Sequence, residues 1–383
     1  MKEGWEYKKL GEVCVSDLGK TLNQSKDTGT FRPYLCAVNI QWDDIDLSTL
    51  KQSRFEDNEI DRYSVRKGDL LVCEGGDIGR AAIWNNKEAI LYQNALHRIR
   101  FNENVLPRFC LQYLRSLKQN GILDSRYAKG VTIKHLVKSS LLSIPIPIPP
   151  LTEQQRIVEE LDLLSSIIEK KKEQLKELDA LAQSIFYDMF GDPVTNEKGW
   201  EVKKIGELAL VKTGPFGSML HKEDYISNGI PLVNPIHIKD FHIVADMDFT
   251  ISNEKAKELD KYILQKDDVV FARRGDIGRC AVVSEEENGY LCGTGSLFVR
   301  FIVEVASTYI MYIIRSSSFT KELISNAKGA TMLNLNSTII ENLWLPLPPL
   351  PLQQQFAQKV EAIERQKELI KQSIAETETL FNS

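Results

Sequence analysis

The sequence contains a long internal repeat, and this repeat constrains the possible folds more than any other feature. Residues 4–13 (GWEYKKLGEV) return as 199–208 (GWEVKKIGEL), an offset of 195. Residues 63–83 return as 262–282 with nine of 21 positions identical, and the proline run 146–151 returns as 345–350. A repeat of this length is too long for a solenoid or a propeller. It indicates one globular domain and one helix, duplicated in tandem, and a duplicated binder recognises two similar targets at once.

Each repeat is expected to begin with a mixed α/β (α+β) domain dominated by a curved sheet. Short apolar runs such as 69–73 and 268–272 stand before turn residues, which favours strands, and helix is expected around 106–120 and 305–326. Prolines at 145–150 and 346–351 remove backbone donors and end each domain. The predicted boundaries are 1–151 and 191–351 for the two domains, and 152–190 and 352–383 for the two helices.

The two predicted helices carry apolar residues at alternating spacings of four and three, which is a heptad pattern. This pattern predicts two long antiparallel coiled-coil helices, related by a pseudo-two-fold axis, that hold the domains apart. The alternative is that each helix lies on its own domain. The register that places Ile168 against Ile370 also places Lys171 against Lys367. The residues expected to pair the helices are Ile157, Leu161, Leu164, Ile168, Leu175, Leu178, Phe356, Val360, Ile363, Ile370 and Ile374.

Bulk composition restricts the class of protein. The 383 residues are 43% hydrophobic, which is enough for two cores. No apolar run reaches the roughly 18 residues of a membrane span, and the first residues do not resemble a signal peptide, so we expect a cytoplasmic protein. The six cysteines lack the spacing of a metal site, and no metal is expected. Net charge is -5, but residues 1–151 carry 22 basic and 18 acidic side chains, against 17 and 21 in residues 191–351.

In its order of parts, the chain resembles the specificity subunit of type I restriction-modification systems. The resemblance covers essentially the whole chain. Its motifs are Pro-x-Pro-Pro-Leu followed by Gln-Gln at 147–155 and 346–354, the turns Gly-Asp-Ile-Gly-Arg at 76–80 and 275–279, Lys-Gly-(Val/Ala)-Thr at 129–132 and 328–331, and Phe-Gly-Asp-Pro at 190–193. Leu352 stands where the first copy has an acidic residue, Glu153.

The resemblance implies a non-catalytic DNA-binding subunit with two target recognition domains. Each domain would read one half of a bipartite sequence in double-stranded DNA, and the helices would act as a spacer and as the dock for two methyltransferase subunits. Restriction subunits, which cut and translocate DNA, would complete the complex. S-adenosylmethionine, ATP and Mg would then be bound by those partners and not by this chain. The unequal charge of the two domains implies that the half-sites differ.

Candidate DNA contacts follow from the repeat. Arg80 and Arg279 close the two Gly-Asp-Ile-Gly turns, where an arginine suits a phosphate or a guanine edge; the alternative is that each arginine only stabilises its turn. Arg273 and Arg274 replace Glu74 and Gly75 of the first copy and are candidates for differing sequence preference. The remaining candidates are the loop lysines Lys129 and Lys328 and the polar or aromatic residues after two equivalent strands, Asn39, Gln41, Trp42, Asn234, His237 and Lys239. The alternative for the two lysines is a solvated loop charge, and the alternative for the other six, which the sequence favours, is a side chain that only satisfies its own loop.

Two other classes of function remain open. The chain lacks the Gly-x-x-x-x-Gly-Lys-(Ser/Thr) phosphate loop and the Asn/Asp-Pro-Pro-(Tyr/Phe) signature of amino methyltransferases. A self-sufficient nuclease or methyltransferase is therefore improbable. A coiled-coil scaffold or adaptor that binds two proteins and no DNA is the main alternative to a DNA-reading subunit.

Overall fold

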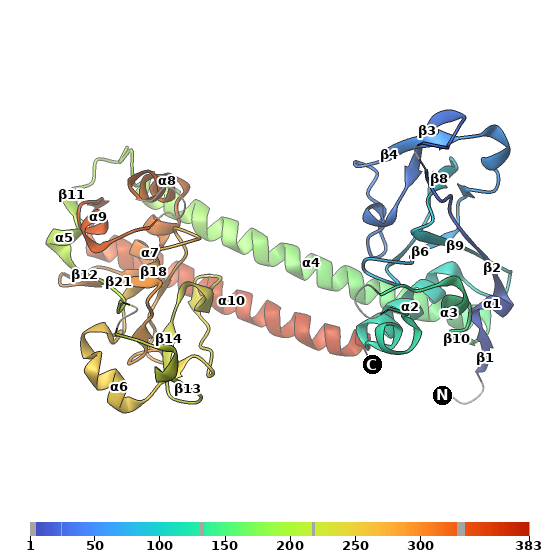
Figure 1. Cartoon of the computed structure of the whole chain (residues 1–383). Helices are drawn as coiled ribbons and strands as arrows, with labels where there is room; N and C mark the ends of the chain where they lie inside the picture. The colour runs from blue at the N-terminus through green and yellow to red at the C-terminus, as the bar shows by residue number, and fades with distance from the viewer. Residues whose placement is uncertain (1–4, 24, 131–133, 217–218, 328–333, 383) are drawn as a thin grey trace. The chain divides into compact units, whose positions relative to one another are not determined.

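The computed structural model describes residues 5–23, 25–130, 134–216, 219–327 and 334–382 (Figure 1). The chain divides into two compact units. The first comprises Met1–Lys170 and Ile374–Ser383, and the second comprises Lys171–Ser373. None of the helices in the described ranges is both long and apolar enough to cross a membrane.

The first unit contains two four-stranded sheets and a short two-stranded ribbon. In strand order the sheets are β2 (Cys14–Leu18), β9 (Leu96–Phe101), β6 (Leu70–Cys73), β7 (Ala81–Ile83), and β4 (Lys51–Phe55), β3 (Thr30–Leu35), β8 (Ile90–Tyr92), β5 (Ser64–Val65). The ribbon pairs β1 (Glu6–Lys9) with β10 (Pro145–Ile148), so the proline run closes the domain beside its first strand. The helices are α1 (Leu10–Val13), α2 (Pro107–Gln119) and α3 (Lys138–Leu142).

The second unit repeats the order of the first sheet and the parallel pair of the second sheet, whose edge strands differ. Its sheets are β12 (Ala209–Thr213), β21 (Ser296–Phe301), β18 (Val269–Ala272), β19 (Cys280–Val282), and β13 (Tyr225–Ile226), β17 (Thr250–Ile251), β14 (Ile230–Val233), β20 (Leu291–Cys292). The ribbon is β11 (Val202–Lys204) with β22 (Trp344–Pro346), and a small hairpin joins β15 (Ile238–Lys239) to β16 (His242–Ile243). The helices are α5 (Ile205–Leu208), α6 (Asn253–Glu258), α7 (Ser307–Arg315), α8 (Ser317–Asn326) and α9 (Ser337–Glu341).

One sequence expectation about the domains needs correction. Each domain contains two four-stranded sheets in place of one dominant curved sheet, and in the second of these sheets β3 or β14 pairs in parallel with β8 or β20. The helix expected around 305–326 is confirmed and consists of two helices. Ser316 leaves the helical conformation, with φ -62° and ψ 142°, and its hydroxyl accepts a hydrogen bond from the Phe319 amide at the start of α8. A serine in this position caps the new helix and ends the old one.

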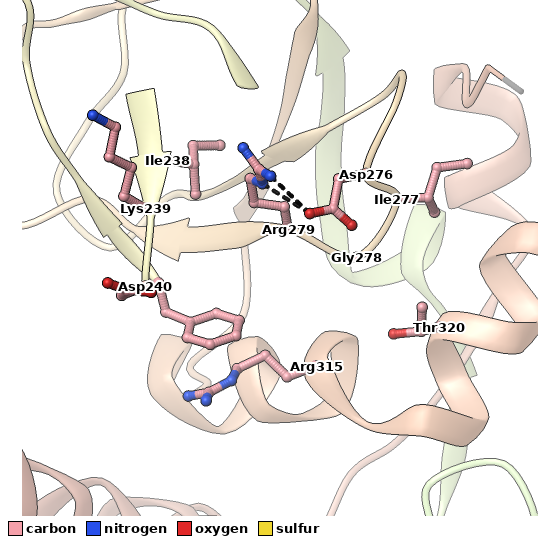
Figure 2. A pocket seen from close by; sticks show the side chains of 10 residues that line it. Ile238, Lys239, Asp240, Asp276, Ile277, Gly278, Arg279, Arg315 and Thr320 are labelled. Carbon is pink, nitrogen blue, oxygen red and sulfur yellow. Dashed lines mark hydrogen bonds and ion pairs between the residues drawn. The ribbon is translucent and has the colours of Figure 1, made fainter. Parts of the chain in front are cut away.

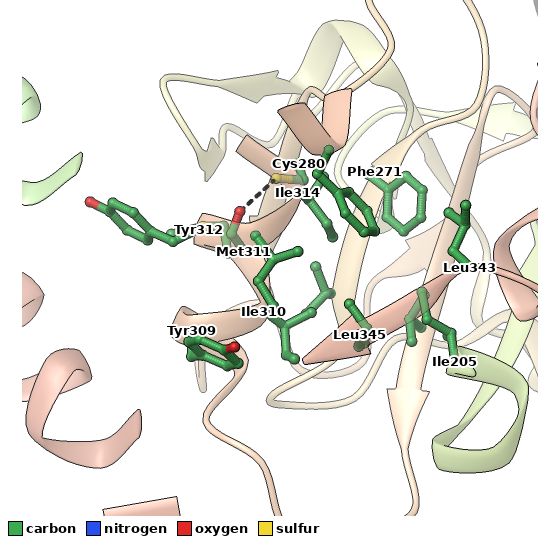
Figure 3. Packing of buried hydrophobic residues seen from close by; sticks show 14 of the residues in the cluster. Ile205, Phe271, Cys280, Tyr309, Ile310, Met311, Tyr312, Ile314, Leu343 and Leu345 are labelled. Atoms are coloured by element: carbon green, nitrogen blue, oxygen red, sulfur yellow. Dashed lines mark hydrogen bonds between the residues drawn. The ribbon is translucent and has the colours of Figure 1, made fainter. Parts of the chain in front are cut away.

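The core of the second unit shows why the apolar runs become strands and helices. All four residues of β18 are buried, and α7 covers this sheet with a continuous apolar run, Tyr309–Ile314 (Figure 3). The same cluster takes in the end of α4 (Leu151–Phe190) and the start of α10 (Leu350–Asn382) through Phe186 and Phe356, whose rings lie 5.7 Å apart. Burial of rings of this size contributes a large apolar area to the stability of the domain.

The apolar seam of α10 is buried where the heptad pattern places it. Phe356, Val360, Ile363 and Ile374 are buried, Ile370 is half-buried, and the polar positions Lys367 and Thr377 are 6% and 7% exposed. In α4 the corresponding side chains are half-buried; these are Ile157, Leu161, Leu164, Ile168, Leu175 and Leu178. Within the second unit the two helices lie side by side and antiparallel, because Phe186 contacts Phe356 while Lys171, earlier in α4, reaches Ser373, later in α10.

The predicted register between the helices is wrong. Lys171 does not face Lys367: its Nζ donates to Ser373 Oγ at 2.7 Å and to Ser373 O at 3.1 Å. Lys367 Nζ instead donates to Asp179 at 2.8 Å and to Glu364 at 2.9 Å. This register gives each of the two ammonium groups a partner, whereas the predicted layer would place two like charges together, which is unfavourable.

A buried glutamine fixes the start of each long helix to its own domain. Gln154 Oε1 accepts from the Leu106 amide at 2.9 Å, and its Nε2 donates to Asn104 O and Pro149 O, both at 2.9 Å. Gln353 Oε1 accepts from the Ala306 amide at 3.0 Å, and its Nε2 donates to Pro348 O at 2.8 Å. The first glutamine of each Gln-Gln pair is therefore a structural residue of the domain end.

Candidate nucleic-acid interface

The structure places most of the sequence-predicted DNA contacts around one turn of 3-10 helix that occurs in both units. The turn is Ala37–Asn39 in the first unit and Pro235–His237 in the second. The Asp46 amide donates to Asn39 O at 2.8 Å, and the Val244 amide donates to His237 O at 2.7 Å. These bonds align the copies at an offset of 198, so that Asn39 corresponds to His237.

Asn39 and His237 perform the same structural task. Asn39 Oδ1 accepts from the Cys36 amide at 3.0 Å, and its Nδ2 donates to Asp46 O at 2.9 Å. His237 Nδ1 lies 3.2 Å from the Asn234 amide and 2.6 Å from Leu232 O. Asn39 is 0% exposed and His237 is 3% exposed. Both side chains hold the turn from inside, so neither is presented on the surface as a reader of base edges.

Arg80 and Arg279 hold the same turn from its other side. Arg80 Nη2 donates to Ala37 O at 2.9 Å, and Arg279 Nη1 donates to the equivalent carbonyl, Pro235 O, at 3.1 Å. Arg279 also pairs with Asp276 at 2.8 Å. The bonds that these two arginines make are therefore those of the alternative given above, in which each arginine stabilises a turn. Each guanidinium nevertheless stays partly accessible, with side-chain exposures of 21% and 37%, so a fixed cation lies beside each turn.

The other candidates divide into surface and buried positions. Gln41 and Lys239 are exposed at equivalent places after the turn, Trp42 is half-buried against the core of the first unit, and Lys129 is exposed. Asn234 is half-buried, and its Oδ1 accepts from the Gly295 amide at 3.4 Å. Lys328 lies outside the described residues.

Arg273 and Arg274 differ sharply in exposure although they are neighbours. Arg273 is 6% exposed and donates to Asn334 Oδ1 at 3.1 Å; burial, and then the charge of Arg274, lower the pKa of Arg273. Arg274 is exposed, so its guanidinium is accessible to a ligand. Of this pair, Arg274 is the side chain placed for an external contact.

A cavity of about 590 Å³ opens beside the turn of the second unit (Figure 2). Lys239 and Arg279 line it together with Arg315, which the sequence analysis did not consider. The Arg315 guanidinium lies over the ring of Phe241, 3.3 Å from its centroid. Phe241 has φ 65°, a left-handed conformation that is uncommon for a bulky side chain. The cavity thus combines three cations with an aromatic ring and two carboxylates, Asp240 and Asp276.

The outermost residue of each turn is not among the candidates that the sequence predicted. Val38 and Ile236 are equivalent at the offset of 198, and they are 58% and 59% exposed. A signal existed in the sequence, because in both turns a large aliphatic residue directly precedes a polar one, Asn39 or His237. Within the described residues, no group of three or more His, Cys, Asp or Glu side chains is arranged to hold a metal ion.

The chain contains two copies of one α/β domain, and each copy is followed by a long helix and carries the same fixed turn and arginine. These features define a tandemly duplicated recognition protein. The family model described as the type I restriction modification DNA specificity domain matches residues 2–179 and again residues 197–379. The chain belongs to this family.

Individual relatives agree with that assignment. The MjaIX specificity subunit of Methanocaldococcus jannaschii is 26% identical over 313 residues, covering 78% of this chain and 71% of the relative. The StySPI specificity subunit of Salmonella potsdam is 21% identical and covers 100% of this chain and 87% of the relative. Both are type I restriction enzyme subunits by name, and they favour the DNA-reading class over the adaptor class.

Solved structures show the same fold. A chain from a study of complex assembly and conformational transition of the type I R-M system matches with a TM-score of 0.66 at 20% identity, covering 100% of this chain and 96% of that one. The S subunit of the type I system from M. genitalium matches with a TM-score of 0.56 at 14% identity, with coverages of 100% and 96%.

Proposed function

We propose that this chain is the DNA sequence-recognition subunit of a type I restriction-modification complex and that it reads a bipartite target, one half-site per domain. The observation that carries the proposal is the repeated turn. Both domains fix the same backbone with the same set of bonds, yet the side chains around it differ: Gln41 corresponds to Lys239, and Gly75 to Arg274. A backbone turn that is the same in both domains, with different side chains exposed around it, suits two related domains that read two different half-sites.

The two domains of such a reader act together because they are covalently joined. Once one domain is bound, the second binding event is intramolecular, and only DNA with the matching spacing gains from it. The continuous helix α4, 40 residues long, supports a spacer role. Insertion of one heptad into α4 is therefore expected to widen the spacing between half-sites, and an unchanged spacing would exclude this role.

We further propose that the paired helices bind two methyltransferase subunits, and that restriction subunits join this complex. Leu163 and Leu181 of α4 are 62% and 48% exposed, and Leu369 of α10 is 66% exposed. Exposed leucines on a paired helix suit a protein partner. In this proposal S-adenosylmethionine, ATP and Mg act in the partner subunits, and this chain contributes no catalytic group.

A domain exchange tests the proposal directly. Replacing residues 1–151 by the corresponding domain of a relative is expected to change one half of the methylated sequence and to leave the other half intact. The readout is the pattern of methylated adenines in the host genome, mapped by long-read sequencing. A change in both halves, or in neither, would contradict the assignment of one half-site to each domain. In a DNA pull-down with the methyltransferase subunits, the proposed function requires sequence-selective retention of DNA, whereas the adaptor alternative requires none.

A further inference from the structure

The outermost residues of the two turns, Val38 and Ile236, are exposed although their surroundings are rigid. Each follows a carbonyl held by an arginine, at Ala37 O and Pro235 O. The next residue in each copy, Asn39 or His237, is buried, and the one after it, Ile40 or Ile238, is 0% exposed. The backbone on both sides of the tip is therefore fixed, and its side chain has no route into the core.

The two tips are equivalent in structure and not merely in sequence. In both copies the turn closes with a backbone bond across it, Asn39 N to Cys36 O at 2.9 Å and His237 N to Asn234 O at 2.8 Å. In the first copy the side-chain Nε2 of Gln41 also donates to the carbonyl of Val38 itself, at 3.2 Å. Scattered exposed apolar residues are ordinary on protein surfaces. The same exposed aliphatic position, fixed by equivalent bonds in both copies, is not explained by packing.

The charge around the tips indicates the kind of partner. Arg80 in the first unit and Arg279 in the second donate to the carbonyl one residue before the tip, so a partly exposed guanidinium accompanies each aliphatic side chain. In the second unit Lys239 is exposed three residues after the tip. A cation beside an apolar tip matches the edge of a DNA groove, where phosphates line the border and the 5-methyl group of thymine lies in the major groove.

We propose that Val38 and Ile236 are specificity-determining residues that pack against the 5-methyl group of a thymine, each in its own half-site. This inference rests on the proposed function and adds to it the base and the chemical group that each domain recognises. The arginines act as positioning residues, since each holds the turn that carries the tip. Apolar contact with the thymine methyl needs a side chain of fixed direction, which the bonds within each turn provide.

The test uses the full chain assembled with its methyltransferase subunits and a duplex that contains its mapped target. In a series of duplexes, each thymine of the two half-sites is replaced singly by uracil, which lacks the methyl group. Dissociation constants are measured for the unmodified complex and for Val38→Ser and Ile236→Ser. Val15→Ser and Ile302→Ser are matched controls, because these aliphatic residues are 65% and 74% exposed elsewhere in the same two units. Thermal unfolding confirms that the variants fold.

We expect Val38→Ser to weaken binding of the thymine duplex by about tenfold, the usual effect of one lost base contact. One uracil substitution in the first half-site should weaken the unmodified complex similarly, and Val38→Ser should be insensitive to that same substitution. Ile236→Ser should behave in the same way in the other half-site. Arg80→Ala and Arg279→Ala should reduce the discrimination between thymine and uracil at these positions, because the tips lose their fixed direction.

Three results would overturn the inference. One is that both tip variants bind like Val15→Ser and Ile302→Ser while the unmodified complex still prefers its target over a scrambled duplex. Another is that no uracil substitution distinguishes the unmodified complex from the tip variants. The third is that the tip variants fail to assemble with the methyltransferase subunits, which would make the tips a protein contact. If the unmodified complex itself shows no sequence preference, the proposed function fails before any variant is compared.

Discussion

Gln154 allows a prediction whose magnitude follows from the structure. Its side chain is 0% exposed and makes three hydrogen bonds to backbone groups, at Leu106 N, Asn104 O and Pro149 O. Gln154→Leu keeps the size of the side chain but removes all three bonds. A buried polar group left without a partner costs about 1–3 kcal/mol. Asn104 is exposed, so water can replace one bond, and the free energy of unfolding should fall by about 2–6 kcal/mol.

This loss is a large fraction of the 5–15 kcal/mol that stabilises a typical domain. Because the chain has two compact units, the effect is best measured locally, by hydrogen exchange of the Leu106 amide and by the unfolding midpoint of the first unit. We expect the amide to exchange at least about tenfold faster and the midpoint to fall by about 4 °C or more. Gln353→Leu, which removes two bonds, should have a smaller effect in the second unit.

The adjacent glutamine supplies the control. Gln155 is exposed, and its Nε2 donates to Glu159 within the same helix at 2.8 Å. Gln155→Leu should change stability by no more than about 0.5 kcal/mol, as is usual for surface substitutions. Equal exchange rates of the Leu106 amide and equal midpoints in the two variants would show that the buried amide does not anchor α4 to its domain.

Further predictions concern pH and the buried charges. Burial would raise the pKa of Glu364, but hydrogen bonds with His242 and Lys367 outweigh this effect and lower the pKa from 4.5 to about 2. The ionised Glu364 carboxylate therefore stabilises the fold above pH 4.5, and this stabilisation is lost as the pH falls towards 2. Acid unfolding of Glu364→Gln should lose this dependence. Burial lowers the pKa of His97 from 6.5 to about 4, so the unfolded chain takes up the proton first, and stability should fall between pH 6.5 and 4. His97→Gln should remove that component in urea unfolding measured across this range, and an unchanged pH profile would contradict it. Removal of the Lys367 ammonium by Lys367→Met should destabilise the second unit at pH 7, because Asp179 and Glu364 lose their partner; equal urea midpoints would refute this.

Much of the fold follows from the sequence because it depends on patterns that a sequence displays directly. The repeat predicted two domains of one topology, and the spacings of four and three predicted the buried seam of α10, including its polar members Lys367 and Thr377. The register between the helices was not predictable in this way. Heptad patterns fit themselves equally well after a shift of one heptad, and the choice depends on polar partners such as Ser373 and Asp179.

The site was harder to predict because polar residues in loops serve two purposes. Asn39 and His237 have side chains that could read bases, yet the structure places both inside a turn, where Asn39 Oδ1 accepts from the Cys36 amide and His237 Nδ1 lies 2.6 Å from Leu232 O. No local signal in the sequence separates a side chain that contacts a base from one that bonds inside a turn, because amide and imidazole side chains suit both tasks. The copies align at an offset of 198 around the turn and at 199 around the arginines, so the second copy has one residue more between these two segments.

The bonds that fix the turn explain how one domain plan can serve two readers. They involve backbone groups, one buried side chain and one arginine, so they tolerate different neighbours as long as those three elements persist. Asn39 and His237 differ in chemistry but occupy equivalent buried positions, and the exposed positions beside them differ freely, as Gln41 and Lys239 do. The bonds that fix the turn are buried or partly buried, and the side chains that differ between the copies are exposed. Substitutions at the exposed positions can therefore change which DNA sequence a domain prefers without loss of the fold.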